Sequence, residues 1–388
     1  MEALLVVGVL VAVFVGFNIG GSSTGVAFGP AVGSRVLGKL GAAILMTAFA
    51  LLGGWTVGRN VVETMGGKIV PQAMFSIEAS VIVLFFVGGA LLVSNIFGVP
   101  ASTSMTAVGA IAGLGVASGT LNWEVMGQIV IWWLVAPVAA FWVSAVVGRY
   151  FYPYLERTFA IDQSEGPLLE MDRTGSLPRP RIHETTTPRE LLSAALVVII
   201  ACYMAFSAGA SNVANAVAPL VGSGDLSMNA GILLAAGAIG LGAFTIARRT
   251  LDTVGNDLTD LPLLAALIVE VVSASLITFL SSIGIPASLA VSATMSIVGL
   301  GWGRATRTVT VGEAVRGEGE ARVSVNALAA DTPSDVPKMG EEDAAELTAE
   351  DLFDPSTTGR VVFLWVLTPS LAAAGAYALF VLVPLYPS

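Results

Sequence analysis

Four hydroxyl side chains, each just after a Gly-x-Pro-x segment, are the residues of this chain best suited to hold an anion. They are Ser102, Thr103 and Ser104 in one place and Ser288 in another. Hydroxyls donate hydrogen bonds, and a helix that starts near a proline leaves free backbone N–H groups whose dipole also favours an anion. Two such helix ends facing each other could hold a tetrahedral anion without an arginine. The alternative is that these hydroxyls only cap, bend or pack membrane helices.

A second group of polar side chains, within two otherwise hydrophobic stretches, carries neutral oxygen atoms. Hydroxyl, amide and unwound carbonyl oxygens are hard ligands that can coordinate sodium, although a site without charge should hold a cation weakly. The candidates for this cation site are Asn18, Ser22, Ser23, Ser211, Asn212 and Asn215. Beyond a sodium ion we expect no metal and no cofactor, because the sequence shows no cluster of metal ligands.

Two carboxylates, Glu78 and Glu270, each lie inside an apolar run, at what look like matching places in the two halves. A carboxylate within a membrane is costly to bury and is a functional candidate by default. These two could carry a coupling proton. They could equally anchor free N–H groups of broken helices, or pair with Arg59 or Arg248.

The chain contains two imperfect copies of one pattern. Gly20 and Gly209, about half the chain apart, each lie where small polar residues interrupt a hydrophobic run. Paired interruptions of this kind in two halves are typical of secondary transporters. We therefore predict that residues 20–34 and 209–222 form half-helices or re-entrant hairpins. Further matches follow in the same order, and they pair 58–66 with 247–255, Glu78 with Glu270, and 98–104 with 284–288.

Composition places this pattern in a membrane. Of the 388 residues, 55% are hydrophobic and 12% are charged, with a mean hydropathy of +0.82, whereas soluble domains carry about 25% charged residues. Ten runs are apolar enough to be membrane spans, and broken segments could raise the count to twelve. They cover residues 2–18, 40–57, 74–97, 104–118, 129–147, 189–207, 229–246, 262–282, 288–302 and 361–384. The predicted fold class is an all-α polytopic membrane protein with broken or re-entrant helices.

Two polar loops divide the chain. We expect a first membrane repeat over 1–148, a cytoplasmic linker over 149–188, a second repeat over 189–303, an acidic cytoplasmic loop over 304–358 and a C-terminal transmembrane helix over 359–388. This arrangement puts nearly all lysines and arginines on one side, which the positive-inside rule makes the cytoplasm. The N-terminus then lies outside a multi-pass protein of the plasma membrane.

The number of crossings and the charge distribution restrict the class of function. Five crossings in each half, an odd number, would insert the second copy upside down, as in inverted-repeat secondary transporters. The net charge of −10 is concentrated in loops, so no nucleic-acid partner is expected. A nucleophile–base pair, a metal cluster and a phosphate-binding loop are all missing from the sequence, so we do not expect an enzyme.

The repeated motifs resemble those of the inorganic phosphate transporter (PiT) family. That family duplicates a Gly-Ala-Asn-Asp-x-Ala-Asn segment and a Gly-x-Pro-x-Ser-Thr-Thr segment, which residues 209–215 and 98–104 match best here. The resemblance implies inorganic phosphate transport across the cytoplasmic membrane by symport with sodium or protons. It further implies cation ligands in the first motif, hydroxyls for the anion in the second, and an assembly that could be a homodimer in the lipid bilayer.

Departures from the family pattern concern the aspartates and the second hydroxyl cluster. Ser22-Ser23 and Ser211-Asn212 replace Asn-Asp, and Leu289-Ala290 follow Ser288, with what looks like an extra helical turn over 291–294. Phosphate near neutral pH carries an O–H that wants an acceptor, whereas sulfate carries none. A sulfate permease of the same family is therefore the alternative function. From another class come a passive anion channel and a transport-inactive membrane sensor.

Overall fold

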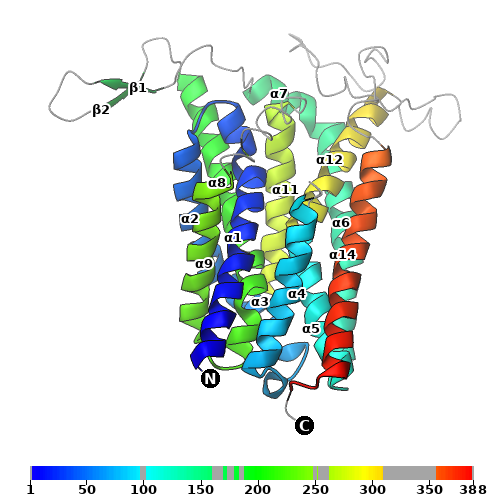
Figure 1. The fold of residues 1–388 in the computed structure, drawn as a ribbon. Helices are drawn as coiled ribbons and strands as arrows, with labels where there is room; N and C mark the ends of the chain where they lie inside the picture. Colours follow the sequence, from blue (N-terminus) through cyan, green and yellow to red (C-terminus); the bar gives the residue numbers. More distant parts are fainter. Residues whose placement is uncertain are drawn as a thin grey trace, which may run out of the picture.

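The computed structural model describes residues 2–96, 102–159, 169–172, 179–182, 188–247, 251, 262–308 and 355–386. These residues form a bundle of long, roughly parallel and antiparallel helices (Figure 1). The helices of the first half are α1 (Glu2–Gly33), α2 (Lys39–Trp55), α3 (Gly58–Glu63), α4 (Ile77–Ile96), α5 (Thr103–Ala117), α6 (Trp123–Val146) and α7 (Tyr152–Phe159). Those of the second half are α8 (Pro188–Gly222), α9 (Met228–Thr245), α11 (Leu263–Ser282), α12 (Leu289–Ala305) and α14 (Pro355–Leu382).

Short elements connect the long helices. Single π-helical turns at Thr64–Lys68 and Val147–Phe151 extend α3 and α6, and 3-10 turns lie at Gln72–Met74 and Thr306–Thr308. One two-stranded antiparallel sheet, β1 (Leu169–Asp172) with β2 (Arg179–Ile182), pairs Leu169 with Ile182.

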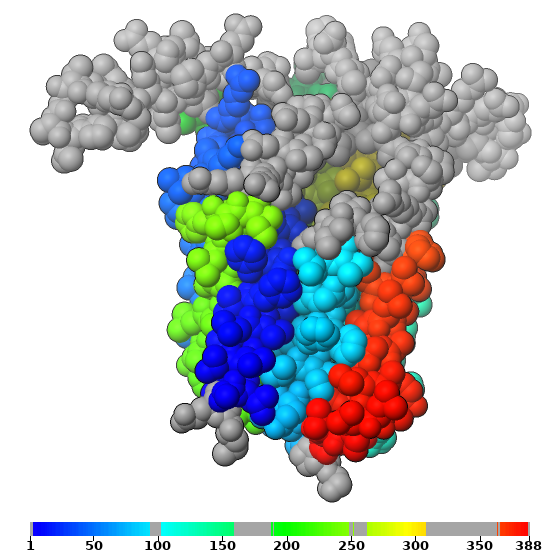
Figure 2. All heavy atoms as spheres, viewed as in Figure 1, coloured from blue at the N-terminus to red at the C-terminus, as the bar shows by residue number. Residues whose placement is uncertain are grey.

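Each of the ten predicted spans overlaps one of the long helices, because apolar runs of this length bury their backbone polar groups best as helices. Within the described residues, six helices are long and apolar enough to cross a membrane. A seventh candidate is the pair formed by α2 with α3 and its π turn, which is bent by 61°. Figure 2 shows α1, α4 and α14 side by side on one face. Each of these helices has exposed apolar side chains, among them Leu10, Phe85 and Leu371, as helices in contact with lipid would have.

The predicted helix breaks at residues 20–34 and 209–222 are wrong. Both stretches continue the preceding helix, so that α1 and α8 are unbroken over 32 and 35 residues. The glycines serve close packing instead. A Cβ on Gly20 would lie 1.9 Å from the carbonyl oxygen of Ile239, and a Cβ on Gly209 would lie 2.1 Å from that of Ala50. Glycine is required where one helix backbone meets another at this distance.

These glycine contacts repeat with two-fold symmetry. The interval from Gly20 to Gly209 equals the interval from Ala50 to Ile239, so α8 meets α2 as α1 meets α9. A second set obeys the same spacing, because Gly53 packs on the Phe206 carbonyl as Gly242 packs on that of Phe17. Figure 1 shows α1 rising from the N-terminus at the lower end, whereas α8 begins at the upper end. The two halves are thus related by inversion.

Two other helix pairs, α4 with α5 and α11 with α12, pack against each other as hairpins. In Figure 1, α4 and α5 occupy the lower part of the bundle and α12 the upper part, beside the upper end of α11. Helix α5 packs against α14, and α12 packs against α6, so the inner arm of each hairpin is covered by a helix of the other half. Glycines again allow the contact: Gly113 lies against the Ala373 carbonyl and Gly303 against that of Ala145.

The described ends of the two polar loops lie on one side of the bundle. Helix α7 and the start of α8 flank one loop, the end of α12 and the start of α14 flank the other, and all lie at the upper end of Figure 1. The start of α1 and the end of α14 lie at the opposite end. This relative arrangement agrees with the predicted topology. Which end faces the cytoplasm stays a prediction, as does the division at residues 149–188 and 304–358.

Candidate functional site

A partly open cavity of about 70 Å³ lies where α1, α4, α5, α8 and α12 meet. One water needs roughly 10–15 Å³ by this measure, so the space suits several waters or one small oxyanion. Six of the predicted site residues line the cavity together with four apolar ones. The lining consists of Asn18, Ser22, Ser23, Val26, Leu91, Thr103, Asn212, Ser288, Leu289 and Ala290.

Two helix N-termini reach this cavity from opposite ends of the bundle. Ser102 caps α5, because its Oγ accepts a hydrogen bond from the Met105 N–H at 3.3 Å, and Ser288 caps α12 by accepting from the Val291 N–H at 3.3 Å. Ser102 is fully buried and does not line the cavity, whereas Ser288 does. The capping oxygens act as acceptors, so their O–H groups stay able to donate. The free N–H groups in the first turn of each helix, together with the positive end of the helix dipole, favour an anion at this place.

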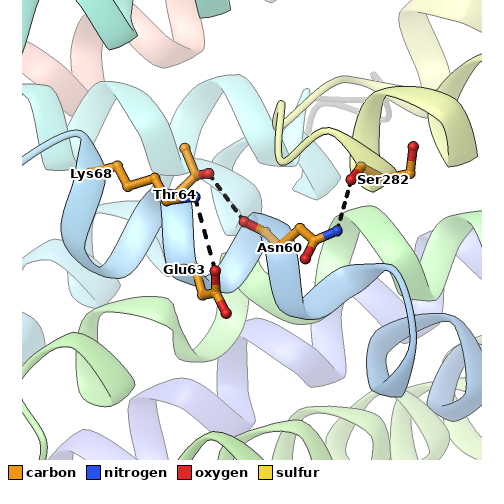
Figure 3. Close-up of polar contacts among 5 residues, drawn as sticks. All are labelled: Asn60, Glu63, Thr64, Lys68 and Ser282. Atoms are coloured by element: carbon orange, nitrogen blue, oxygen red, sulfur yellow. Dashed lines mark hydrogen bonds and ion pairs between the residues drawn. The ribbon is translucent and has the colours of Figure 1, made fainter.

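The tip of the second hairpin is held in place by α3 and α6. Asn60 on α3 points toward the end of α11 and donates from Nδ2 to the Ser282 carbonyl at 2.7 Å (Figure 3). The next turn contains Gly284 at φ +77°, where a Cβ would lie 2.8 Å from Thr64 Oγ1. The Trp133 indole N–H then donates to the Pro286 carbonyl at 2.8 Å. These contacts fix the backbone that presents Ser288.

Figure 3 also shows two further polar contacts in the segment that follows Asn60. Thr64 Oγ1 donates to the Asn60 carbonyl at 3.1 Å, and Lys68 approaches Glu63 at 3.9 Å. Both charged side chains of that pair are more than half exposed, so the pair contributes little to stability. The hydrogen bond from Asn60 is therefore the polar contact that ties α3 to the hairpin.

A hydrogen-bond network joins α5 to α8 beside the cavity. The Thr103 hydroxyl donates to Asn212 Oδ1 at 2.6 Å, and Asn215 Nδ2 donates to the same oxygen at 3.0 Å. Asn215 Nδ2 also lies 3.2 Å from Thr103 Oγ1 and 3.1 Å from Ser104 Oγ. Ser104 and Asn215 are buried behind the residues that line the cavity. Four residues predicted for two different ions thus form one cluster.

The symmetry-related half of the cavity has no such network among the described residues. Ser23 precedes Asn212 by the interval that separates Gly20 from Gly209, and the slightly shorter interval from Ser102 to Ser288 places Leu289 at the position of Thr103. The helix itself also differs, because Gly299 lies four positions farther from Ser288 than Gly109 lies from Ser102. Since Gly109 and Gly299 make equivalent interhelical contacts, α12 contains the extra turn expected from the sequence, about 6 Å of helix.

Three of the remaining polar candidates donate hydrogen bonds to carbonyls of their own helices. Asn18 donates from Nδ2 to the Phe14 carbonyl at 2.8 Å, and Ser22 donates to the Asn18 and Ile19 carbonyls at 3.2 Å. Ser211 donates to the Ala208 carbonyl at 3.3 Å and lies outside the cavity lining. Such back-bonding satisfies a hydroxyl donor but leaves its oxygen able to accept or to coordinate.

Four lining residues were missed: Val26, Leu91, Leu289 and Ala290. An aliphatic side chain has no chemistry that would identify it as part of a site. Two of these four positions could nevertheless be predicted from the alignment of the two copies. Val26 is the counterpart of Asn215 at the spacing of the glycine pair, and Ala290 is the counterpart of Ser104 at the spacing of the two caps. Comparison of the two copies position by position could have found them.

The predicted equivalence of Glu78 and Glu270 is wrong. Glu78 is the second residue of α4 and is half-buried, whereas Glu270 is the eighth residue of α11 and is buried. The interval between the two hairpin caps pairs Glu270 with Leu84 instead. Neither oxygen of Glu270 has a hydrogen-bond partner among the residues described, and neither carboxylate lines the cavity. Arg59 donates to the Trp55 carbonyl and to Asn229, and Arg248 lies outside the described residues.

Comparisons with known proteins agree with this architecture. The profile of the phosphate transporter family matches residues 19–376. Sulfate permease CysP of Bacillus subtilis is 29% identical over 294 residues, which cover 76% of each chain. A putative phosphate permease of Helicobacter pylori is 24% identical and covers 77% of this chain and 68% of its own. The structure titled "The sodium-dependent phosphate transporter" superposes with a TM-score of 0.65 at 19% identity over 99% of both chains.

Proposed function

Because this chain belongs to the phosphate transporter family, we propose that it carries a tetrahedral inorganic oxyanion across a membrane, with sulfate preferred over phosphate. The observation that carries the preference is the cavity lining. Among its residues in the described part of the chain, hydroxyl and amide groups are present and no carboxylate is. The family's aspartate positions hold Ser23 and Asn212 here.

The lining favours an anion that needs only donors. Sulfate presents four oxygens without a proton, and each can accept from a hydroxyl, an amide N–H or a helix N-terminus. Phosphate near neutral pH carries at least one O–H, which is left without a strong acceptor in a neutral cavity. An unsatisfied polar group at a buried site costs about 1–3 kcal/mol. CysP, at 29% identity, is a relative named as a sulfate permease.

Phosphate is the second candidate. It was the first expectation from the sequence, and the putative phosphate permeases of several bacteria are similar to this chain over more than three quarters of its length. Neutral oxygens of Asn18, Ser22 or Ser288 could accept the phosphate O–H, although more weakly than a carboxylate.

Coupling to a cation is a further part of the proposal. The predicted sodium ligands Asn18, Ser22, Ser23 and Asn212 all line the same cavity, so a sodium ion and an anion could bind next to each other and offset each other's charge. Proton coupling is the other option. A passive channel would need neither ion.

Uptake into proteoliposomes tests the function. Radiolabelled sulfate and phosphate are offered with an imposed sodium gradient, an imposed proton gradient, or none. Accumulation of sulfate above equilibrium, with phosphate a weaker substrate, is the expected result. Phosphate accumulation without sulfate would overturn the preference, and equilibration without accumulation would replace the symporter by a channel.

A further inference from the structure

The side-chain amide of Asn212 is oriented by two hydrogen bonds, one of them from Asn215, whose own Oδ1 is buried and has no partner among the described residues. Asn212 Oδ1 accepts both hydrogen bonds, from the Thr103 hydroxyl at 2.6 Å and from Asn215 Nδ2 at 3.0 Å. An amide oxygen can accept both, whereas an amide nitrogen can accept neither. The Nδ2 end of Asn212 is consequently the end left for the cavity that this side chain lines. No described residue accepts a hydrogen bond from it.

We propose that Asn212 is the specificity-determining donor to the anion, with its N–H groups turned to the cavity by Thr103 and Asn215. This inference rests on the proposed transport of an oxyanion and assigns Asn212 to the anion rather than to the cation site predicted from the sequence. Two amide protons recognise an oxygen that carries no proton of its own. They offer nothing to the O–H of hydrogenphosphate.

Among the described residues, contacts like those that orient Asn212 occur only on the side of the cavity formed by α5 and α8, and not on the side formed by α1 and α12. At the symmetry-related place, Ser23 replaces the amide and Leu289 replaces the Thr103 hydroxyl. A leucine side chain lines the cavity there but cannot donate a hydrogen bond. The anion is therefore held on the side formed by α5 and α8. Hydroxyls of Ser23 and Ser288 complete its coordination from the other side.

A single-atom change should reverse the preference. In Asn212→Asp, one carboxylate oxygen still accepts from Thr103 and Asn215, because these donors are unchanged. The other oxygen takes the place of the N–H groups, so it repels sulfate and accepts the O–H of hydrogenphosphate. The ratio of sulfate affinity to phosphate affinity is the quantity that this change moves.

The test compares binding of sulfate and phosphate to the purified full-length protein by calorimetry, beside uptake by the same variants. Asn212→Asp should lower the sulfate-to-phosphate affinity ratio by about tenfold or more, since a hydrogen bond to a charged group is lost. Asn122→Asp is the matched control. It adds the same charge outside the cavity lining, and its carboxylate can still accept from the Val125 N–H at the start of α6, so the ratio should stay within about twofold.

The positioning role of Thr103 is tested without any change of charge. Thr103→Val removes the donor to Asn212 Oδ1 and releases the amide, whereas Thr103→Ser keeps it. The valine variant should lose most of the preference for sulfate, and the serine variant should retain it. Equal ratios in the two variants would overturn the positioning role.

Failure of this inference is separable from failure of the proposed function. Sulfate binding without uptake would overturn the transport function, and the variant ratios would still decide the role of Asn212. An unchanged ratio in Asn212→Asp, or an equal fall in Asn122→Asp, would overturn that role while transport stands. A wild-type protein that binds neither anion would overturn both.

Discussion

Gly209 on α8 lies so close to Ala50 on α2 that a Cβ would stand 2.1 Å from the Ala50 carbonyl oxygen. The same relationship, repeated by Gly20 and Ile239, joins α1 to α9. Each contact links a helix of one half to a helix of the other. The glycines thus bring α1 against α9 and α2 against α8 backbone to backbone. Helices α1 and α8 of these pairs carry Asn18 and Asn212 to the cavity at the N-termini of α5 and α12.

Alanine at either of these glycines should destabilise the protein. Gly20→Ala and Gly209→Ala both drive a methyl group into a carbonyl of another helix, and we expect a loss of about 1–3 kcal/mol or more. Thermal unfolding in detergent measures it. Gly237→Ala, on the same helix as Ile239, has nothing within 4 Å of the new Cβ and should be neutral or stabilising. Equal loss at all three positions would contradict this role.

The turn at Gly284 should be more sensitive to alanine than the turn at Gly119. Both glycines have positive φ, +77° and +69°, so both variants bear a backbone strain of about 1–2 kcal/mol. Only at Gly284 does the Cβ also meet a neighbour, Thr64 Oγ1 at 2.8 Å, because Gly119 has none within 4 Å. A larger fall in melting temperature and in uptake is expected for Gly284→Ala. Equal effects would show that strain alone matters.

The hydrogen bond of Asn60 should anchor the second hairpin. Asn60→Ala removes its contact with the Ser282 carbonyl, and we expect a stability loss of about 0.5–1.5 kcal/mol with a clear fall in transport rate. Lys68→Ala removes the exposed pair with Glu63 nearby and should change stability by less than about 1 kcal/mol. Unfolding curves and initial uptake rates decide between them. A transport rate unaffected by Asn60→Ala would argue that the tip is held by other contacts.

Restoring polar groups to the second half of the cavity should strengthen anion binding. The double variant Ser23→Asn, Leu289→Thr rebuilds at that side the pair that Asn212 and Thr103 form on the other. One added hydrogen bond to a charged ligand is expected to tighten sulfate binding about tenfold. Ser23→Asn, Leu289→Val has the same shape without the hydroxyl and serves as the control. Calorimetry that finds both variants alike would exclude a subsite there.

The sequence sufficed for the helices but not for their breaks. Apolar runs predicted the ten long helices that the described residues contain, because length and hydropathy are local properties. The glycines at 20 and 209 were misread since a glycine that permits close packing and a glycine that ends a helix look alike in one dimension. Their partners, Ile239 and Ala50, carry no polar signal. Only the three-dimensional packing distinguishes the two roles.

The candidate site was predictable as a set of residues, not as a geometry. Motifs located Thr103, Asn212 and Ser288, which the structure brings to one cavity. Their assignment to separate cation and anion sites relied on a family pattern and missed the bond between Thr103 and Asn212. Glu78 and Glu270 were paired by similar neighbours, yet they occupy different turns of their helices. To align the two copies position by position, one needs equivalent points in the structure, such as the helix caps Ser102 and Ser288.

The contact between α5 and α14 also bears on how the chain is made. Gly109 and Gly113 on α5 lie against the carbonyls of Pro369 and Ala373 on α14. During synthesis, α5 emerges well before α14, with α6 to α12 in between, whereas α12 meets its partner α6 already in the bilayer. The face of α5 that packs against α14 therefore has no partner until α14 is synthesised, near the end of translation. Biogenesis of this protein cannot proceed one half at a time, and a nascent chain lacking α14 should expose α5 to protease.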